Sequence, residues 1–97
     1  KINKIIRETQ LKVWMLLIEQ KINNSETDIQ LSLRSKNNSH RYLTDYEYQN
    51  NLRSLFSTLE GEKFVKWLES NGLKYTIVNR DDGVGYESWD ALIIEVA

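Results

Sequence analysis

The fold is decided by residues 73–96, which read LKYTIVNRDDGVGYESWDALIIEV. The first part, 73–78, is rich in β-branched and aromatic residues and is predicted to be a strand. Residues 80–90 contain an Asp-Gly pair and a second glycine, which favour a loop. The segment 91–96 is short, apolar and β-branched. It is therefore predicted to be a closing strand that runs antiparallel to the first.

A further strand is indicated by residues 28–34, which alternate strictly between apolar and polar side chains. This pattern predicts a strand with one buried face. Residues 36–39 have the composition of a turn. Residues 40–43 are expected to return as a second, short strand. The sheet should therefore contain three to four antiparallel strands.

The N-terminal segment carries apolar side chains at spacings of three and four over residues 2–22. This spacing predicts a long helix. Within it, residues 13–18 are apolar around the whole circumference of the helix. A helix of this kind is either covered on every side or meets a partner. We therefore also predict that two copies could form a homodimer through this helix.

A second helical region is predicted between residues 45 and 71. Thr44 and Glu47 have the spacing of a capping box, which marks a helix start. The helix is expected to falter at Gly61 and to end at Gly72, where a residue in the left-handed conformation belongs. The pattern leaves open whether this region is one kinked helix or two.

Together these elements follow the order α-β-(β)-α-α-β-β. They predict a single α+β domain over residues 1–97, with a long N-terminal helix, an antiparallel sheet and helices packed on one face of it. The absence of cysteine excludes disulfides, thiolate metal sites and cysteine nucleophiles. The single histidine excludes any motif that needs two. No cofactor is expected from these counts.

The membrane and targeting signals are missing from the sequence. No apolar run reaches the length of a transmembrane helix. The N-terminal segment mixes charged and apolar residues and lacks a small-residue cleavage site. The expectation is a cytoplasmic protein.

The net charge of −1 hides an imbalance along the chain. Residues 1–44 hold eight basic and four acidic side chains, whereas residues 45–97 hold five basic and ten acidic ones. The acidic residues are densest near the C-terminus.

The loop at residues 80–90 is the main candidate site because it combines carboxylates with aromatic side chains. Tyrosine and tryptophan are common interface anchors, and acidic neighbours attract a basic partner. A simpler interpretation is a solvated hairpin connection in which the tryptophan packs at the sheet edge. The candidate protein-binding residues are Asp81, Asp82, Tyr86, Glu87, Trp89 and Asp90.

Two alternatives assign a different chemistry to charged side chains. In the first, Asp81, Asp82, Glu87 and Asp90 hold Mg²⁺ or Mn²⁺ in a small phosphoester hydrolase. In the second, the following basic residues touch phosphate as a weak nucleic-acid site: Arg34, Lys36 and Arg41. A chain of pI near 5.8 is not built as a general nucleic-acid binder.

Two smaller signals carry less weight. His40 lies in a polar turn and is interpreted as a solvated surface residue. The string Arg80-x-x-Gly83-x-Gly85 resembles the pyrophosphate-binding pattern of N-acetyltransferases. That pattern lies between a strand and a helix, whereas a β-branched segment follows it here. The resemblance covers six residues, and we assign no family from it.

The leading functional expectation is a small non-enzymatic protein-interaction domain, an inhibitor or adaptor whose partner has a basic surface. No catalytic constellation remains after the exclusions above. The frequent Lys, Asn and Ile residues are typical of AT-rich coding sequence, as found in phages and mobile elements. In this hypothesis the acidic aromatic loop blocks a basic, nucleic-acid-binding groove on the target.

Overall fold

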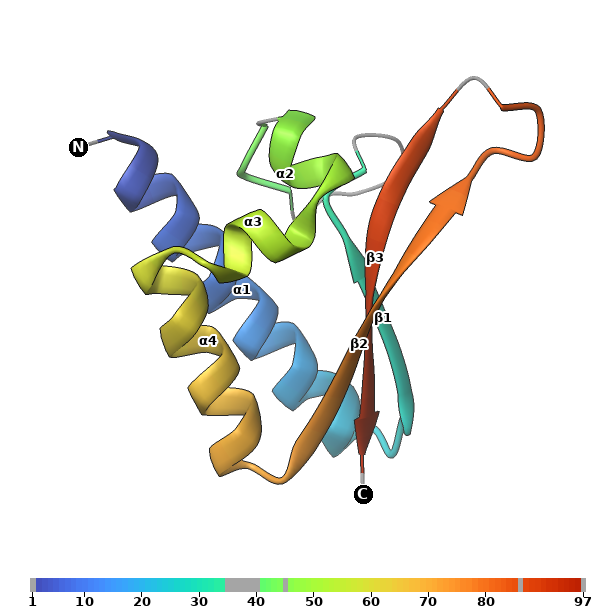
Figure 1. The fold of residues 1–97 in the computed structure, drawn as a ribbon. Coiled ribbons are helices and arrows are strands. Elements are labelled where there is room, and N and C mark those ends of the chain that lie inside the picture. Colours follow the sequence, from blue (N-terminus) through green and yellow to red (C-terminus); the bar gives the residue numbers. More distant parts are fainter. Residues whose placement is uncertain (1, 35–40, 45, 86, 97) are drawn as a thin grey trace.

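The computed structural model describes residues 2–34, 41–44, 46–85 and 87–96. Its elements are α1 (Ile2–Asn23), β1 (Asp28–Ser32), α2 (Tyr46–Asn50), α3 (Leu52–Phe56), α4 (Leu59–Ser70), β2 (Leu73–Asp81) and β3 (Ser88–Val96). The strands form an antiparallel sheet in the order β1-β3-β2. The helices lie on one face of this sheet (Figure 1). The predicted α+β fold, with its long N-terminal helix, is confirmed.

The core lies between the sheet and the two long helices. Leu92 of β3 is opposite Leu31 of β1 and Ile77 of β2, so alternate strand residues share the inner face. On the helix side, the rings of Trp14 from α1 and Phe64 from α4 lie 6.1 Å apart between centroids. Both rings are fully buried. The alternate apolar side chains of the strands and the apolar side chains of α1, which recur at helical spacing, therefore pack into one apolar layer.

The last two strands are longer than the sequence predicts. Pairing between β2 and β3 continues beyond the apolar segments through Arg80 opposite Trp89 and Asp81 opposite Ser88. The expectation of a loop over residues 80–90 is therefore wrong at both ends, and only residues 82–87 connect the strands. The reason is that ladder hydrogen bonds join backbone groups and need no apolar side chains.

The described part of residues 40–43 does not form the predicted strand. His40 lies outside the described residues, and residues 41–43 have no regular structure. The amides of Tyr42 and Leu43 both donate to the Oε1 atom of Gln10 on α1, at 2.6 and 3.0 Å. A buried helix side chain thus satisfies backbone donors that a neighbouring strand would otherwise bind.

The helical region after residue 45 consists of three helices. Asn51 caps α3 by accepting from the Ser54 amide, and Thr58 caps α4 by accepting from the Gly61 amide. The helical region is thus interrupted at Asn51 and again just before α4. The expectation that the helix falters at Gly61 is wrong, because this glycine lies within α4. Asp45, within the predicted capping box, lies outside the described residues. The predicted end of the region is confirmed, because Gly72 follows α4 with a φ of +68°.

The apolar middle of α1 is only partly covered. Trp14 and Ile18 are buried, but 65% of Leu16 and 61% of Ile5 are exposed. The homodimer through this helix stays a prediction. None of the described helices combines the length and hydropathy needed to cross a bilayer.

An ion pair ties α1 to the first turn of α4. The Nε atom of Arg7 donates to Oε1 of Glu60 at 2.7 Å, and only 9% of the Glu60 side chain is exposed. This hydrogen bond lowers the pKa of Glu60 below its ordinary value of 4.5. The same bond raises the pKa of Arg7.

Replacing Glu60 by glutamine is expected to lower the free energy of unfolding by about 1 kcal/mol at neutral pH. Because the pKa of Glu60 is depressed in the folded state, its contribution is complete above about pH 4.5 and is lost as the pH falls through the folded-state value. Urea unfolding at about pH 7 and about pH 3 should therefore show a smaller difference between variant and wild type at the lower pH. Glu62→Gln, in the same turn but exposed, is the control. A difference that does not change with pH would contradict this assignment.

Candidate functional site

The six residues predicted to bind a protein do not form one exposed surface. Asp81 ends β2, Asp82 and Glu87 lie in the connection, and Trp89 and Asp90 lie within β3. Tyr86, the sixth, lies outside the described residues. Trp89 is 8% exposed and Asp90 is 9% exposed. Two members of the set are therefore buried.

Two of the carboxylates shape the connection itself. Oδ1 of Asp81 accepts from the Gly83 amide at 2.8 Å. Oδ1 of Asp82 accepts from the amides of Val84 and Gly85, at 3.0 and 2.9 Å. Both glycines have a φ of +81°, which other residues adopt only with strain. These carboxylates are thus explained by the turn that they stabilise.

Asp90 binds structural partners on both oxygens. Oδ2 accepts from the amide of Leu52, the first residue of α3, at 2.9 Å. Oδ1 accepts from Nδ2 of Asn79 on β2, at 3.3 Å. This carboxylate fixes the start of α3 against the sheet and is not presented to a partner.

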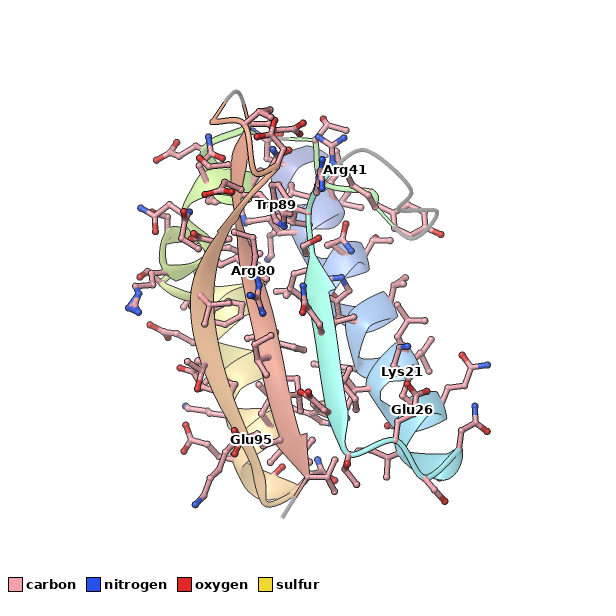
Figure 2. All side chains as sticks on the ribbon, turned by 90° about the vertical axis from the view of Figure 1, so that its right-hand side faces the viewer. Lys21, Glu26, Arg41, Arg80, Trp89 and Glu95 are labelled. Atoms are coloured by element: carbon pink, nitrogen blue, oxygen red, sulfur yellow. The ribbon has the colours of Figure 1, made fainter. Side chains whose placement is uncertain are left out.

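Trp89 lies on the sheet face opposite the helices, beside Arg80 of β2 (Figure 2). The guanidinium carbon of Arg34 lies 3.8 Å from the centroid of the Trp89 ring. Nη2 of Arg34 also lies 3.7 Å from Oε2 of Glu87. Arg34 therefore covers the face of the tryptophan on which a partner would stack.

The positions of the charged side chains also test the two alternatives, a divalent-metal site and a nucleic-acid site. Among the described residues, no group of three histidine or acidic side chains is placed to hold a metal ion. Of the basic residues, Arg34 stacks on Trp89, and the Nε of Arg41 donates to the Leu43 carbonyl at 3.1 Å. Lys36 and His40 lie outside the described residues. Within the part of the chain that the structure describes, the acidic side chains do not converge on a metal position, and the basic side chains do not converge on a phosphate position.

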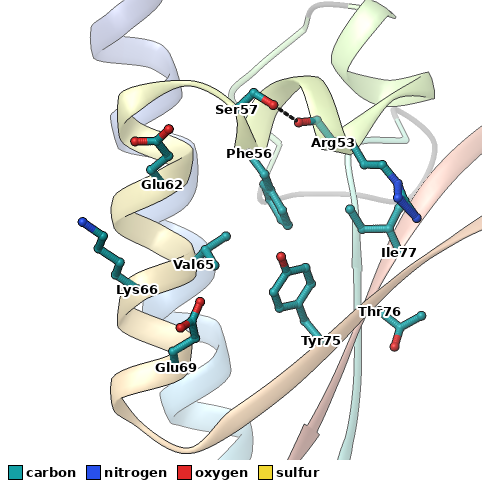
Figure 3. Close-up of a pocket in the computed structure, with 10 residues that line it drawn as sticks. All are labelled: Arg53, Phe56, Ser57, Glu62, Val65, Lys66, Glu69, Tyr75, Thr76 and Ile77. Atoms are coloured by element: carbon teal, nitrogen blue, oxygen red, sulfur yellow. Dashed lines mark hydrogen bonds between the residues drawn. The ribbon is translucent and has the colours of Figure 1, made fainter.

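A groove that the sequence reasoning missed lies between α3, α4 and β2 (Figure 3). This α4–β2 groove has a volume of about 680 Å³. Its apolar lining comes from Phe56 of α3, Val65 of α4, and Tyr75 and Ile77 of β2. Its charged lining is balanced between Arg53, Glu62, Lys66 and Glu69. The lining is completed by Ser57 and Thr76.

The groove follows from the way the chain leaves α4. After Gly72 the chain reverses into β2, and in Figure 1 the strand diverges from α4 along its length. The rings of Phe56 and Tyr75 close one part of the gap, 5.6 Å apart and nearly perpendicular. Tyr75 remains 37% exposed. The groove therefore presents aromatic and aliphatic surface to solvent.

The same strand borders the groove with an unpaired edge. In the order β1-β3-β2, β2 pairs with β3 on one side and with no other described strand on the other. It is nine residues long. The sequence contained one relevant signal, the alternation of residues 73, 75 and 77 as an apolar face. The position of β2 at the edge of the sheet could not be read from the sequence, because it depends on pairing with residues 88–96.

The opposite face of β2 has a different character. Residues 73, 75 and 77 pair with Val96, Ile94 and Leu92 on the helix side. Residues 74, 76, 78 and 80 therefore lie on the face without helices. Lys74 and Arg80 are both exposed there.

Comparison with known proteins identifies no relative: no family model, no curated protein and no solved structure matches the chain.

Proposed function

We propose that this protein is a non-enzymatic protein-interaction domain that binds an extended segment of a partner as an added strand. The partner segment pairs with the free edge of β2 and places its inner side chains in the α4–β2 groove. The observation that carries this proposal is the nine-residue edge strand beside an apolar groove.

Strand addition requires two features, and both are present here. Main-chain groups of an exposed edge supply hydrogen bonds, and pockets for alternate side chains supply specificity. Side chains directly opposite one another on neighbouring strands have Cβ atoms about 4.5–5.5 Å apart. Inner side chains of an added strand would thus contact Tyr75 and Ile77, and longer ones would reach Phe56 and Val65.

The long edge also needs an explanation on physical grounds. Exposed strand edges promote unwanted pairing, so proteins commonly shorten, bulge or cover them. β2 is among the two longest strands in the described chain, yet its edge stays open beside a groove. A binding role accounts for both the length of this edge and the apolar lining beside it.

The proposal retains an inhibitor or adaptor role but places the contact in the groove and not on the acidic loop. Asp81, Asp82, Glu87 and Asp90 all have partners within the chain. Binding through them would compete with bonds that hold the turn and the start of α3.

The proposal predicts that Val65→Glu weakens peptide binding by at least about tenfold. Val65 lines the groove, and a buried carboxylate there would meet the apolar side chains of the added strand. A random library of ten-residue peptides is selected on the wild-type chain, and the affinities of selected peptides are measured by calorimetry.

The matched control is Leu16→Glu, because Leu16 is an exposed apolar residue on α1 and does not line the groove. This variant should keep wild-type affinity, and circular dichroism should show both variants folded. The proposal fails if the library yields no binder. It also fails if the selected peptides bind folded Val65→Glu as tightly as wild type.

A further inference from the structure

We infer that the segment accepted by β2 is an acidic amphipathic strand, in which apolar side chains alternate with aspartate or glutamate. This inference rests on the proposed function, because it specifies the partner of the same edge. Apolar residues would point into the α4–β2 groove, and carboxylates would lie on the face of the sheet without helices.

The preference for carboxylates comes from the outer face of β2. The charged residues of β2 on that face are Lys74 and Arg80, both basic and both exposed. Neither forms an ion pair within the described chain. Opposite charges on neighbouring strands stabilise the pairing, and like charges directly opposite destabilise it. An added strand therefore gains from acidic residues opposite these two positions.

The residues of β3 that lie opposite these two cations do not remove the preference for an acidic partner. Glu95 of β3 is directly opposite Lys74 and balances part of its charge, although the two side chains form no ion pair. Trp89, which has no charge, is opposite Arg80. Figure 2 shows Arg80 and Glu95 on this face, well separated along the sheet. The end of the strand at Arg80 thus has no acidic residue directly opposite it on β3.

The groove itself imposes an apolar requirement and no net charge. Two basic and two acidic side chains line it, and they lie around the apolar groups in Figure 3. Inner side chains of an added strand would bury the exposed part of Tyr75. The two faces of β2 therefore select alternating apolar and acidic residues.

The same charges argue against a second copy of β2 as the occupant. Antiparallel pairing of β2 with itself over its full length centres on Ile77 and places Lys74 opposite Arg80 on both sides. Both pairs are repulsive. A partner with carboxylates at these positions avoids that repulsion.

The test uses three synthetic ten-residue peptides in which valine alternates with glutamate, lysine or serine. The glutamate peptide should bind wild type about fivefold more tightly than the serine peptide, and the lysine peptide should bind most weakly. The double variant Lys74→Glu/Arg80→Glu should reverse the order. The control Lys4→Glu/Lys63→Glu changes the net charge equally beside a different pocket, and should keep the wild-type order.

The possible outcomes separate this inference from the proposed function. Equal affinities for the three peptides, all lost in Val65→Glu, would overturn the acidic preference and leave strand addition standing. Failure of all three to bind, while library-selected peptides bind the groove, would also overturn it. The remaining outcome is a wild-type dimer in sedimentation that Val65→Glu converts to a monomer. A second copy would then occupy the groove, and the acidic-partner inference would be wrong.

Discussion

Gly61→Ala is expected to lower the free energy of unfolding by about 3 kcal/mol, near the upper end of the cost of overpacking. A Cβ atom at Gly61 would collide with the carbonyl oxygen of Leu55 and would lie 2.5 Å from the Cα atom of Phe56. Both obstacles are backbone atoms, so no change of side-chain rotamer relieves them. The start of α4 would have to move away from the end of α3.

Urea unfolding followed by circular dichroism measures this loss, with Gly72→Ala as the matched control. Gly72 has a positive φ but open space around its Cα, so alanine there should cost only about 1 kcal/mol. If Gly61→Ala proves no more destabilising than Gly72→Ala, the backbone of Leu55 and Phe56 does not pack directly against Gly61. Because Phe56 lines the α4–β2 groove, Gly61→Ala should also weaken binding of library-selected peptides.

Asp90→Ala is expected to lower the free energy of unfolding by about 2–3 kcal/mol, because a buried donor loses its partner. The amide of Leu52 donates to Oδ2 of Asp90, and Leu52 itself is completely buried. Asn79 loses a hydrogen bond on β2 at the same time. The expected result is a less stable junction between α3 and the β2–β3 hairpin.

Asp81→Ala is the comparison, since Asp81 is also an aspartate of the hairpin but is exposed and accepts only from Gly83 among the bonds described. Its loss should cost less than about 1 kcal/mol. Thermal or urea unfolding of both variants measures the two losses of stability. Equal losses would show that the hydrogen bond between Asp90 and the Leu52 amide contributes little to stability, and would contradict its role in holding the start of α3 against the sheet.

Local pattern was sufficient for most of the secondary structure. The three-and-four spacing of α1 and the alternation after Asp28 reflect the geometry of a helix and of a strand, and each needs only neighbouring residues to be recognised. The left-handed residue at Gly72 was predictable for the same reason. These features led directly to the α+β class that the structure confirms.

The errors occur where distant segments meet. Gly61 was interpreted as a helix breaker because glycine has low helix propensity. In the structure it permits contact between two helix ends. Residues 41–43 were expected to form a strand, but Gln10 binds their amides from α1. A propensity describes a residue alone, whereas each of these outcomes depends on a second segment.

The candidate site shows the same division. Asp81 and Asp90 are indistinguishable as acidic residues of one hairpin, yet one is exposed and the other is buried against α3. The groove could not be predicted, because it depends on how far β2 diverges from α4. The apolar residues 73, 75 and 77 can be read from the sequence, but the two faces of β2 acquire a role in binding only once the strand lies at an edge of the sheet.

Composition and local periodicity alone were enough to exclude cysteine chemistry and to assign most of the element types and the fold class, since these depend on residue identity and short-range spacing. Tertiary structure decided the strand order, the sites of the helix breaks, the burial of Trp89 and Asp90, and the open edge of β2 beside the groove. Each of these depends on contacts between residues distant in the chain. Such contacts form through pairing and close packing of whole elements, which no short stretch of sequence specifies.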